Sequence, residues 1–126
     1  MLSVNLQLER DKAAPARART MVRGLEPLLG EEKTEDATLL VSELVTNAVK
    51  YGSGPVELKI ETGEGHGRFT ISDAGGGATP ALRETGGKRA GGYGLHLVDR
   101  IADTWGVIHA SMHVWFEMTF EDSISV

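Results

Sequence analysis

The fold is decided by the segment Val41-Ser42-Glu43-Leu44-Val45-Thr46-Asn47-Ala48-Val49-Lys50-Tyr51. At roughly 100° per residue, the apolar residues of this region form one continuous helical stripe, made of Ala37, Leu40, Val41, Leu44, Val45 and Ala48. Glu43 and Asn47 lie four residues apart, about one helical turn, along one edge of that stripe. A carboxylate there can take a proton and an amide oxygen can hold magnesium, a combination that suits phosphate chemistry. Taken alone, the pair is explained better by a solvated Glu and an unrelated Asn on a surface helix.

Upstream of this helix, the sequence predicts a strand and a further helix. Residues 4–9 alternate between apolar and polar side chains, as in a half-buried strand. Residues 15–29 carry apolar side chains near helical spacing, with Pro15 in the first turn, and Gly30 ends the pattern. The acidic stretch 31–36 favours the start of the next helix, because it opposes the positive end of the helix dipole.

Downstream, residues 56–61 and 68–72 alternate around a glycine-containing loop and predict a β-hairpin. After a glycine-rich irregular stretch, residues 94–103 predict a helix, and residues 105–110 and 113–120 predict two strands. One helical connection in this order is compatible with a parallel crossover, but hairpins dominate. The order therefore predicts an α+β fold: a two-layer sandwich with a mixed, mainly antiparallel sheet and three helices on one face.

The length, amino-acid composition and net charge limit the classes of protein to which the chain can belong. The chain has 126 residues, of which 40% are hydrophobic and 25% charged, as in one globular domain spanning residues 1–126. It contains no cysteine, which excludes disulfides and thiol catalysis and is compatible with the cytoplasm. A net charge of −5 argues against direct binding to nucleic acid or to an anionic membrane. The absence of a membrane-length apolar run and of a signal peptide leads us to expect a cytoplasmic protein.

Two glycine-rich segments add candidate binding chemistry. Asp73, at a strand end, is followed by Ala74-Gly75-Gly76-Gly77, so its carboxylate can accept a hydrogen bond from an exocyclic amine while the glycines admit a flat ring. Gly91-Gly92-Tyr93-Gly94 precedes the helix over 94–103 and can offer backbone N–H groups to a phosphate. Each segment alone is weak, because turns of both kinds are common.

The order of these elements is more specific than any one of them. Glu43-x-x-x-Asn47, then Asp73-x-Gly75-x-Gly77, then Gly92-x-Gly94-Leu95 resembles the three boxes of the GHKL (Bergerat-fold) ATP-binding superfamily. Within it, the sequences of the first and last boxes look like those of the anti-sigma-factor serine/threonine kinases of bacterial stress and sporulation control. The ending Val114-Trp115-Phe116-Glu117 looks most like actinobacterial members. The resemblance covers roughly residues 10–120, and it implies ATP and Mg²⁺ as cofactors.

The resemblance assigns a role to each matching position. Glu43 is expected to be the general base that prepares the attacking hydroxyl, Asn47 the protein's direct magnesium ligand, and Asp73 the residue that holds the adenine amino group.

Gly75 and Gly77 are expected to form the adenine-side turn and residues 78–90 a lid over the phosphates, which Lys88 or Arg89 contacts. Gly92, Tyr93 and Gly94 are expected to give the phosphates backbone N–H groups, with Leu95 packed beside the nucleotide.

The implied function is an anti-sigma factor with kinase activity. By resemblance, it phosphorylates an anti-anti-sigma protein of the STAS type, sequesters a sigma factor and works as a homodimer. One departure supports an alternative. Where the family often has Gly-x-Thr before the last strand, this chain has Ser111, Met112 and His113. The alternative is a binding module that holds its partner through the arginines of the first helix and uses nucleotide only structurally, or not at all.

Overall fold

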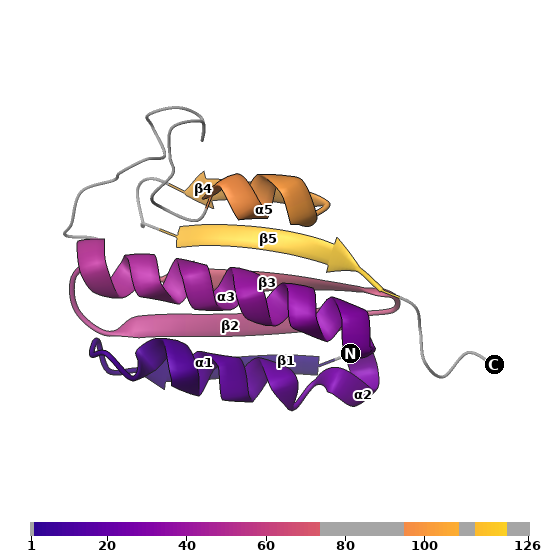
Figure 1. Ribbon diagram of the computed structural model, residues 1–126, viewed down its shortest axis with the longest axis horizontal. Coiled ribbons are helices and arrows are strands. Elements are labelled where there is room, and N and C mark those ends of the chain that lie inside the picture. Colours follow the sequence, from indigo (N-terminus) through magenta and orange to yellow (C-terminus); the bar gives the residue numbers. More distant parts are fainter. Residues whose placement is uncertain (1, 74–94, 109–112, 121–126) are drawn as a thin grey trace.

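A computed structural model describes residues 2–73, 95–108 and 113–120. In chain order the elements are β1 (Leu2–Leu8), α1 (Ala14–Arg23), α2 (Glu26–Leu29), α3 (Glu31–Tyr51), β2 (Val56–Gly63), β3 (His66–Ser72), α5 (Leu95–Ile101), β4 (Thr104–Ile108) and β5 (His113–Thr119). Figure 1 shows α1, α3 and α5 on the same side of the strands. The predicted α+β sandwich of two layers is thus confirmed.

The sheet has five strands in the order β1-β2-β3-β5-β4. Every pair of neighbouring strands is antiparallel. Since β5 is antiparallel to both β3 and β4, those two strands run in the same direction with β5 between them. The helical connection through α5 therefore is a crossover between parallel strands, although no two hydrogen-bonded neighbours in the described sheet are parallel.

The core lies between the sheet and the helices. Strand alternation sends every second side chain to the helix face, and the register aligns Val4, Ile60, Phe69 and Phe116 in one row across four strands. The rings of Phe69 and Phe116 stack at 4.8 Å between centroids with 8° between their planes. Both rings are buried, so they anchor the centre of the sheet against the helices above.

Helix α3 supplies the largest helical part of this core. Its first turn carries Glu31 and Glu32 and its last turn Lys50, each favourable at that end of the helix dipole. The predicted stripe is confirmed by the burial of Ala37, Leu40, Val41, Leu44 and Val45. Ala48, the last member, is half-buried and packs against the same core.

The prediction of one continuous helix over residues 15–29 was wrong. Helix α1 ends at Arg23, and the single turn of α2 begins at Glu26. Between them Leu25, at φ −95° and ψ 8°, leaves the helical region. Pro27 gives the physical reason, because it has no N–H to donate to the carbonyl of Arg23 and its ring would clash with that carbonyl in a continuous helix.

Candidate functional site

Helix α3 has two polar flanks, one on each side of its buried stripe. We call Thr38 and Ser42 the Ser42 flank, and Glu43 and Asn47 the Glu43 flank. Arg19 of α1 donates a hydrogen bond from Nη1 to Ser42 Oγ over 2.9 Å, which shows that the Ser42 flank faces α1. By helical geometry the Glu43 flank lies on the other edge of the stripe.

The Glu43 flank lies toward α5. In Figure 1, α1 and α5 appear on opposite sides of α3, and α5 is in contact with α3. Glu43 and Asn47 are both half-buried. The predicted placement of the pair on one edge of the apolar stripe is consistent with this arrangement, whereas their chemical roles stay predictions.

The carboxylate of Glu43 has no hydrogen-bond or ion-pair partner among the residues that the structure describes. A half-buried carboxylate without a protein donor keeps its oxygens available to accept a proton from a bound hydroxyl. The neighbouring backbone is held by the helix itself, and Thr46 Oγ1 donates to the carbonyl of Ser42 over 2.7 Å. The geometry therefore presents Glu43 on a rigid element.

Asp73 comes to the end of the same helix. Ser72, the last residue of β3, is in register with Glu57 and His113, on the sheet face opposite the core row, so the next residue turns toward the helices. A side chain built on Gly52, which follows α3, would overlap the Asp73 carboxylate. Gly52 is five residues beyond Asn47, or about 7.5 Å along a helix axis. The structure thus brings Asp73 to the end of α3 that carries Asn47.

Other predicted site residues lie outside the described ranges, and their roles stay predictions: Gly75, Gly77, Lys88, Arg89, Gly92, Tyr93 and Gly94. The predicted lid over 78–90 lies there too, as do Ser111 and Met112. Leu95 is the first residue of α5. Helix α5 contacts α3, and the packing of Leu95 beside the nucleotide stays a prediction.

The residues that are described fit a magnesium nucleotide. The amide oxygen of Asn47 is a hard ligand of the kind magnesium prefers, and magnesium takes few protein ligands because phosphates and waters complete its shell. Within the described ranges no cluster of three His, Cys, Asp or Glu side chains is placed to hold a metal. A magnesium ion here would accordingly be bound through Asn47 and the nucleotide together.

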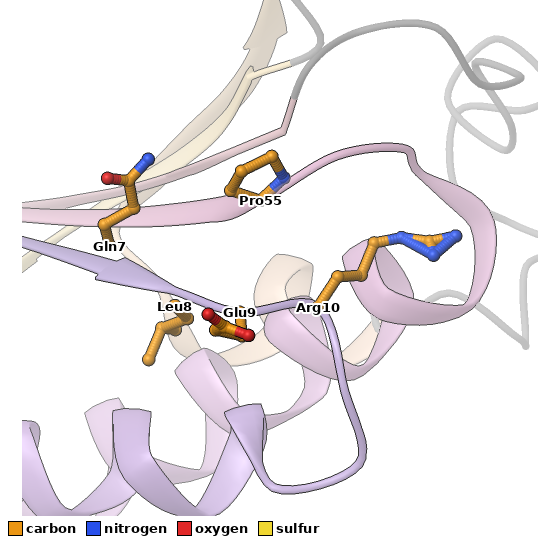
Figure 2. A pocket seen from close by; sticks show the side chains of 5 residues that line it. All are labelled: Gln7, Leu8, Glu9, Arg10 and Pro55. Carbon is orange, nitrogen blue, oxygen red and sulfur yellow. The ribbon is translucent and has the colours of Figure 1, made fainter.

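A separate groove lies at the end of β1. It has a volume of about 520 Å³ and is lined by Gln7, Leu8, Glu9, Arg10 and Pro55. Figure 2 shows Gln7 and Leu8 on opposite sides of the strand, and the Arg10 side chain extending beyond the strand end. The groove includes none of the predicted nucleotide residues, and we assign it no role in the site.

Gly52 belongs to none of the motifs that the sequence predicts for the site, although it touches the position of Asp73. A glycine after a helix is common, and nothing local in the sequence marks its contact with Asp73. Only the pairing of β2 with β3 and the packing of α3 on β3 bring the two residues together.

The chain matches the model of a known protein family. The family model described as the histidine kinase-like ATPase domain matches residues 8–118. No match was found among the curated proteins. In the described part of the chain, no helix is both long and apolar enough to cross a membrane.

Proposed function

The chain belongs to the histidine kinase-like ATPase family, and from this premise we propose that it is an ATP-dependent serine/threonine protein kinase that acts as an anti-sigma factor. Its substrate is a hydroxyl of a STAS-domain anti-anti-sigma protein, and its second partner is a sigma factor that it sequesters in the cytoplasm. Family membership makes ATP, with magnesium, the expected ligand. The arrangement of Glu43, Asn47 and Asp73 around α3 is the observation that supports the proposal.

Each of the three residues has one task. Asn47 would hold magnesium through its amide oxygen, and the metal would neutralise part of the phosphate charge of the substrate ATP. Asp73 would accept a hydrogen bond from the adenine amine. Glu43 takes the proton of the attacking serine or threonine hydroxyl while that oxygen bonds to the γ-phosphorus and the bond to the β-phosphate oxygen breaks, which leaves ADP.

Helix α1 supports the proposed contact with a protein partner. Arg17 and Arg23 are exposed on this helix. The hydrogen bond from Arg17 lowers the pKa of the exposed Asp11 carboxyl, whereas Arg19 is committed to Ser42. Arg23 thus gives an acidic partner a cationic contact in the last turn of α1.

The proposed homodimer has support at the sheet edge. Strand β1 lies at the edge of the described sheet, and residues 2–8 contain neither a charged residue nor a proline. Charges and prolines are the usual means of preventing edge pairing, so β1 lacks this protection, and no other strand of the described ranges pairs with its outer edge.

The kinase activity is tested with Glu43→Ala. The purified protein is incubated with γ-labelled ATP, magnesium and the STAS-domain proteins encoded in the same genome. Glu43→Ala should keep nucleotide binding and lose roughly 10²- to 10⁴-fold in transfer rate, the usual size of a general-base contribution. Glu35→Ala, which changes an exposed glutamate of the same helix, is the matched control and should transfer at the wild-type rate.

Two outcomes would contradict the kinase proposal. Transfer at the wild-type rate by Glu43→Ala would make this residue structural. No transfer to any STAS-domain protein, together with tight sigma-factor binding, would favour the alternative binding module, in which the family domain serves as a scaffold for partner binding.

A further inference from the structure

There is no room for a side chain at position 52, and this lack of room, and not the backbone conformation, is why the residue is a glycine. Its φ of −96° and ψ of −162° are open to any residue. By contrast, Gly54, two residues on, has a φ of 71°, which favours glycine by conformation alone. A Cβ on Gly52 would overlap the carboxylate of Asp73 and would also approach the carbonyl oxygen of Ala48 to 2.7 Å. The missing side chain is what lets Asp73 lie against the end of α3.

The Asp73 carboxylate lies beside the C-terminal end of α3. The C-terminal end of a helix carries a partial negative charge from its unpaired carbonyl groups. The 21-residue α3 ends at Tyr51, and the Gly52 N–H is used by the carbonyl of Ala48 over 2.9 Å. The helix dipole therefore does not attract the Asp73 carboxylate to this place, which leaves the space at Gly52 as the feature that admits it.

We propose that Gly52 is a positioning residue: it fixes where the Asp73 carboxylate lies and thereby sets the preference of the site for a base with an exocyclic amine. The proposal rests on the proposed function, in which Asp73 accepts a hydrogen bond from the adenine amine. It adds that selectivity among nucleotides depends on a residue that touches no nucleotide.

The test compares two nucleotides that differ at one group. ADP carries the exocyclic amine, and inosine diphosphate carries a carbonyl oxygen in its place. Affinities for both are measured by calorimetry, with magnesium, for the wild-type protein and Gly52→Ala. A hydrogen bond to a charged group predicts a wild-type preference for ADP of roughly 10- to 150-fold. In Gly52→Ala the preference should fall below about threefold, because the displaced carboxylate no longer meets the amine while the other contacts remain.

Gly24→Ala is the matched control. Gly24 also follows a helix, but a Cβ there would meet its nearest atom, the carbonyl oxygen of Met21, at 3.4 Å, an ordinary contact. This variant should keep the wild-type preference. A folded Gly52→Ala protein that keeps the preference overturns the inference and leaves the proposed function intact. A wild-type protein that binds neither nucleotide overturns the proposed function itself.

A second measurement does not depend on nucleotide. The destabilisation caused by Gly52→Ala is measured by urea unfolding in the wild-type background and in Asp73→Ala, where the overlapping carboxylate is absent. The loss should be clearly larger with Asp73 present, as expected for residues in contact. An equal loss in both backgrounds, or failure of both Gly52→Ala proteins to fold while Asp73→Ala folds, would assign the crowding to the Ala48 carbonyl and overturn the inference.

Discussion

The two flanks of α3 share one apolar stripe but treat their polar side chains in opposite ways. On the Ser42 flank, Ser42 is tied to α1 by Arg19, and Thr38 is 5% exposed. On the Glu43 flank, Glu43 and Asn47 remain half-buried, and the Glu43 carboxylate has no hydrogen-bond or ion-pair partner within the described ranges. Ser42 is thus tied into the helix layer, whereas the Glu43 carboxylate has no such tie within the described ranges.

Because of this difference, substitutions on the two flanks of α3 should separate effects on stability from effects on function. Changes on the Ser42 flank should alter the free energy of unfolding and leave nucleotide binding unchanged. Changes in Asn47 and Asp73 should weaken nucleotide binding, and a change in Glu43 should slow phosphoryl transfer while nucleotide still binds.

Asp73→Asn should produce the largest effect. The substitution removes the charge of the only carboxylate proposed to accept the adenine amine, and a charge-assisted hydrogen bond is about twice as strong as a neutral one. The affinity for ADP and ATP, measured by calorimetry, should fall by up to roughly 150-fold, the value of a hydrogen bond to a charged group. Asp11→Asn, at an exposed position, is the control. Unchanged affinity in Asp73→Asn would remove the adenine role from this residue.

Asn47→Ala should weaken nucleotide binding only when magnesium is present. Losing a direct ligand should cost at least the roughly 10- to 100-fold in affinity that is typical for loss of a metal's outer-shell partner. ADP affinities with magnesium and with EDTA should then become similar, whereas the wild-type protein binds more tightly with magnesium. The exposed Asn5 offers the same substitution in β1 as a control. Persistence of the full magnesium effect would assign the metal to other groups.

Thr38→Val should raise the stability of the protein. The Thr38 hydroxyl is buried and makes no hydrogen bond, and leaving a buried polar group unsatisfied costs about 1–3 kcal/mol. Replacing it with a methyl group should therefore increase the free energy of unfolding by up to that amount, seen as a higher urea midpoint with an unchanged m-value. Thr46→Val is the control, because its hydroxyl is bonded to the Ser42 carbonyl and its loss should destabilise. A destabilised Thr38→Val would mean that water bonds this hydroxyl.

The elements around α3 could be predicted because their signals are local. Alternation of polar and apolar residues marked the strands, and the 3.6-residue period marked the stripe and its edge. The break after Arg23 also had a local signal in Pro27, but the apolar spacing over residues 15–29 outweighed it in the prediction. Bounds shifted by one or two residues at β1 and β3, as is usual for short elements.

The order of strands and the contact of Asp73 with Gly52 could not be predicted in this way. The insertion of β5 between β3 and β4 depends on pairing between distant segments. Likewise, Gly52 and Asp73 meet only because β2 and β3 pair and α3 packs above them. The sequence identified Glu43, Asn47 and Asp73 as types of residue with suitable chemistry, while their relative position is a property of the folded chain.

Ser42→Ala should have the smallest effect, confined to stability. Removing the acceptor for Arg19 Nη1 costs about 0.5–1.5 kcal/mol for a typical hydrogen bond, and the better helix propensity of alanine offsets roughly 0.5 kcal/mol of that loss. The free energy of unfolding should thus fall by about 1 kcal/mol or less. A double-mutant cycle with Arg19→Ala isolates the interaction, because either single change removes the same bond and the second should then cost little more. Affinity for ADP should be unchanged in all three variants, and a fall in affinity would show that the Ser42 flank also shapes the site.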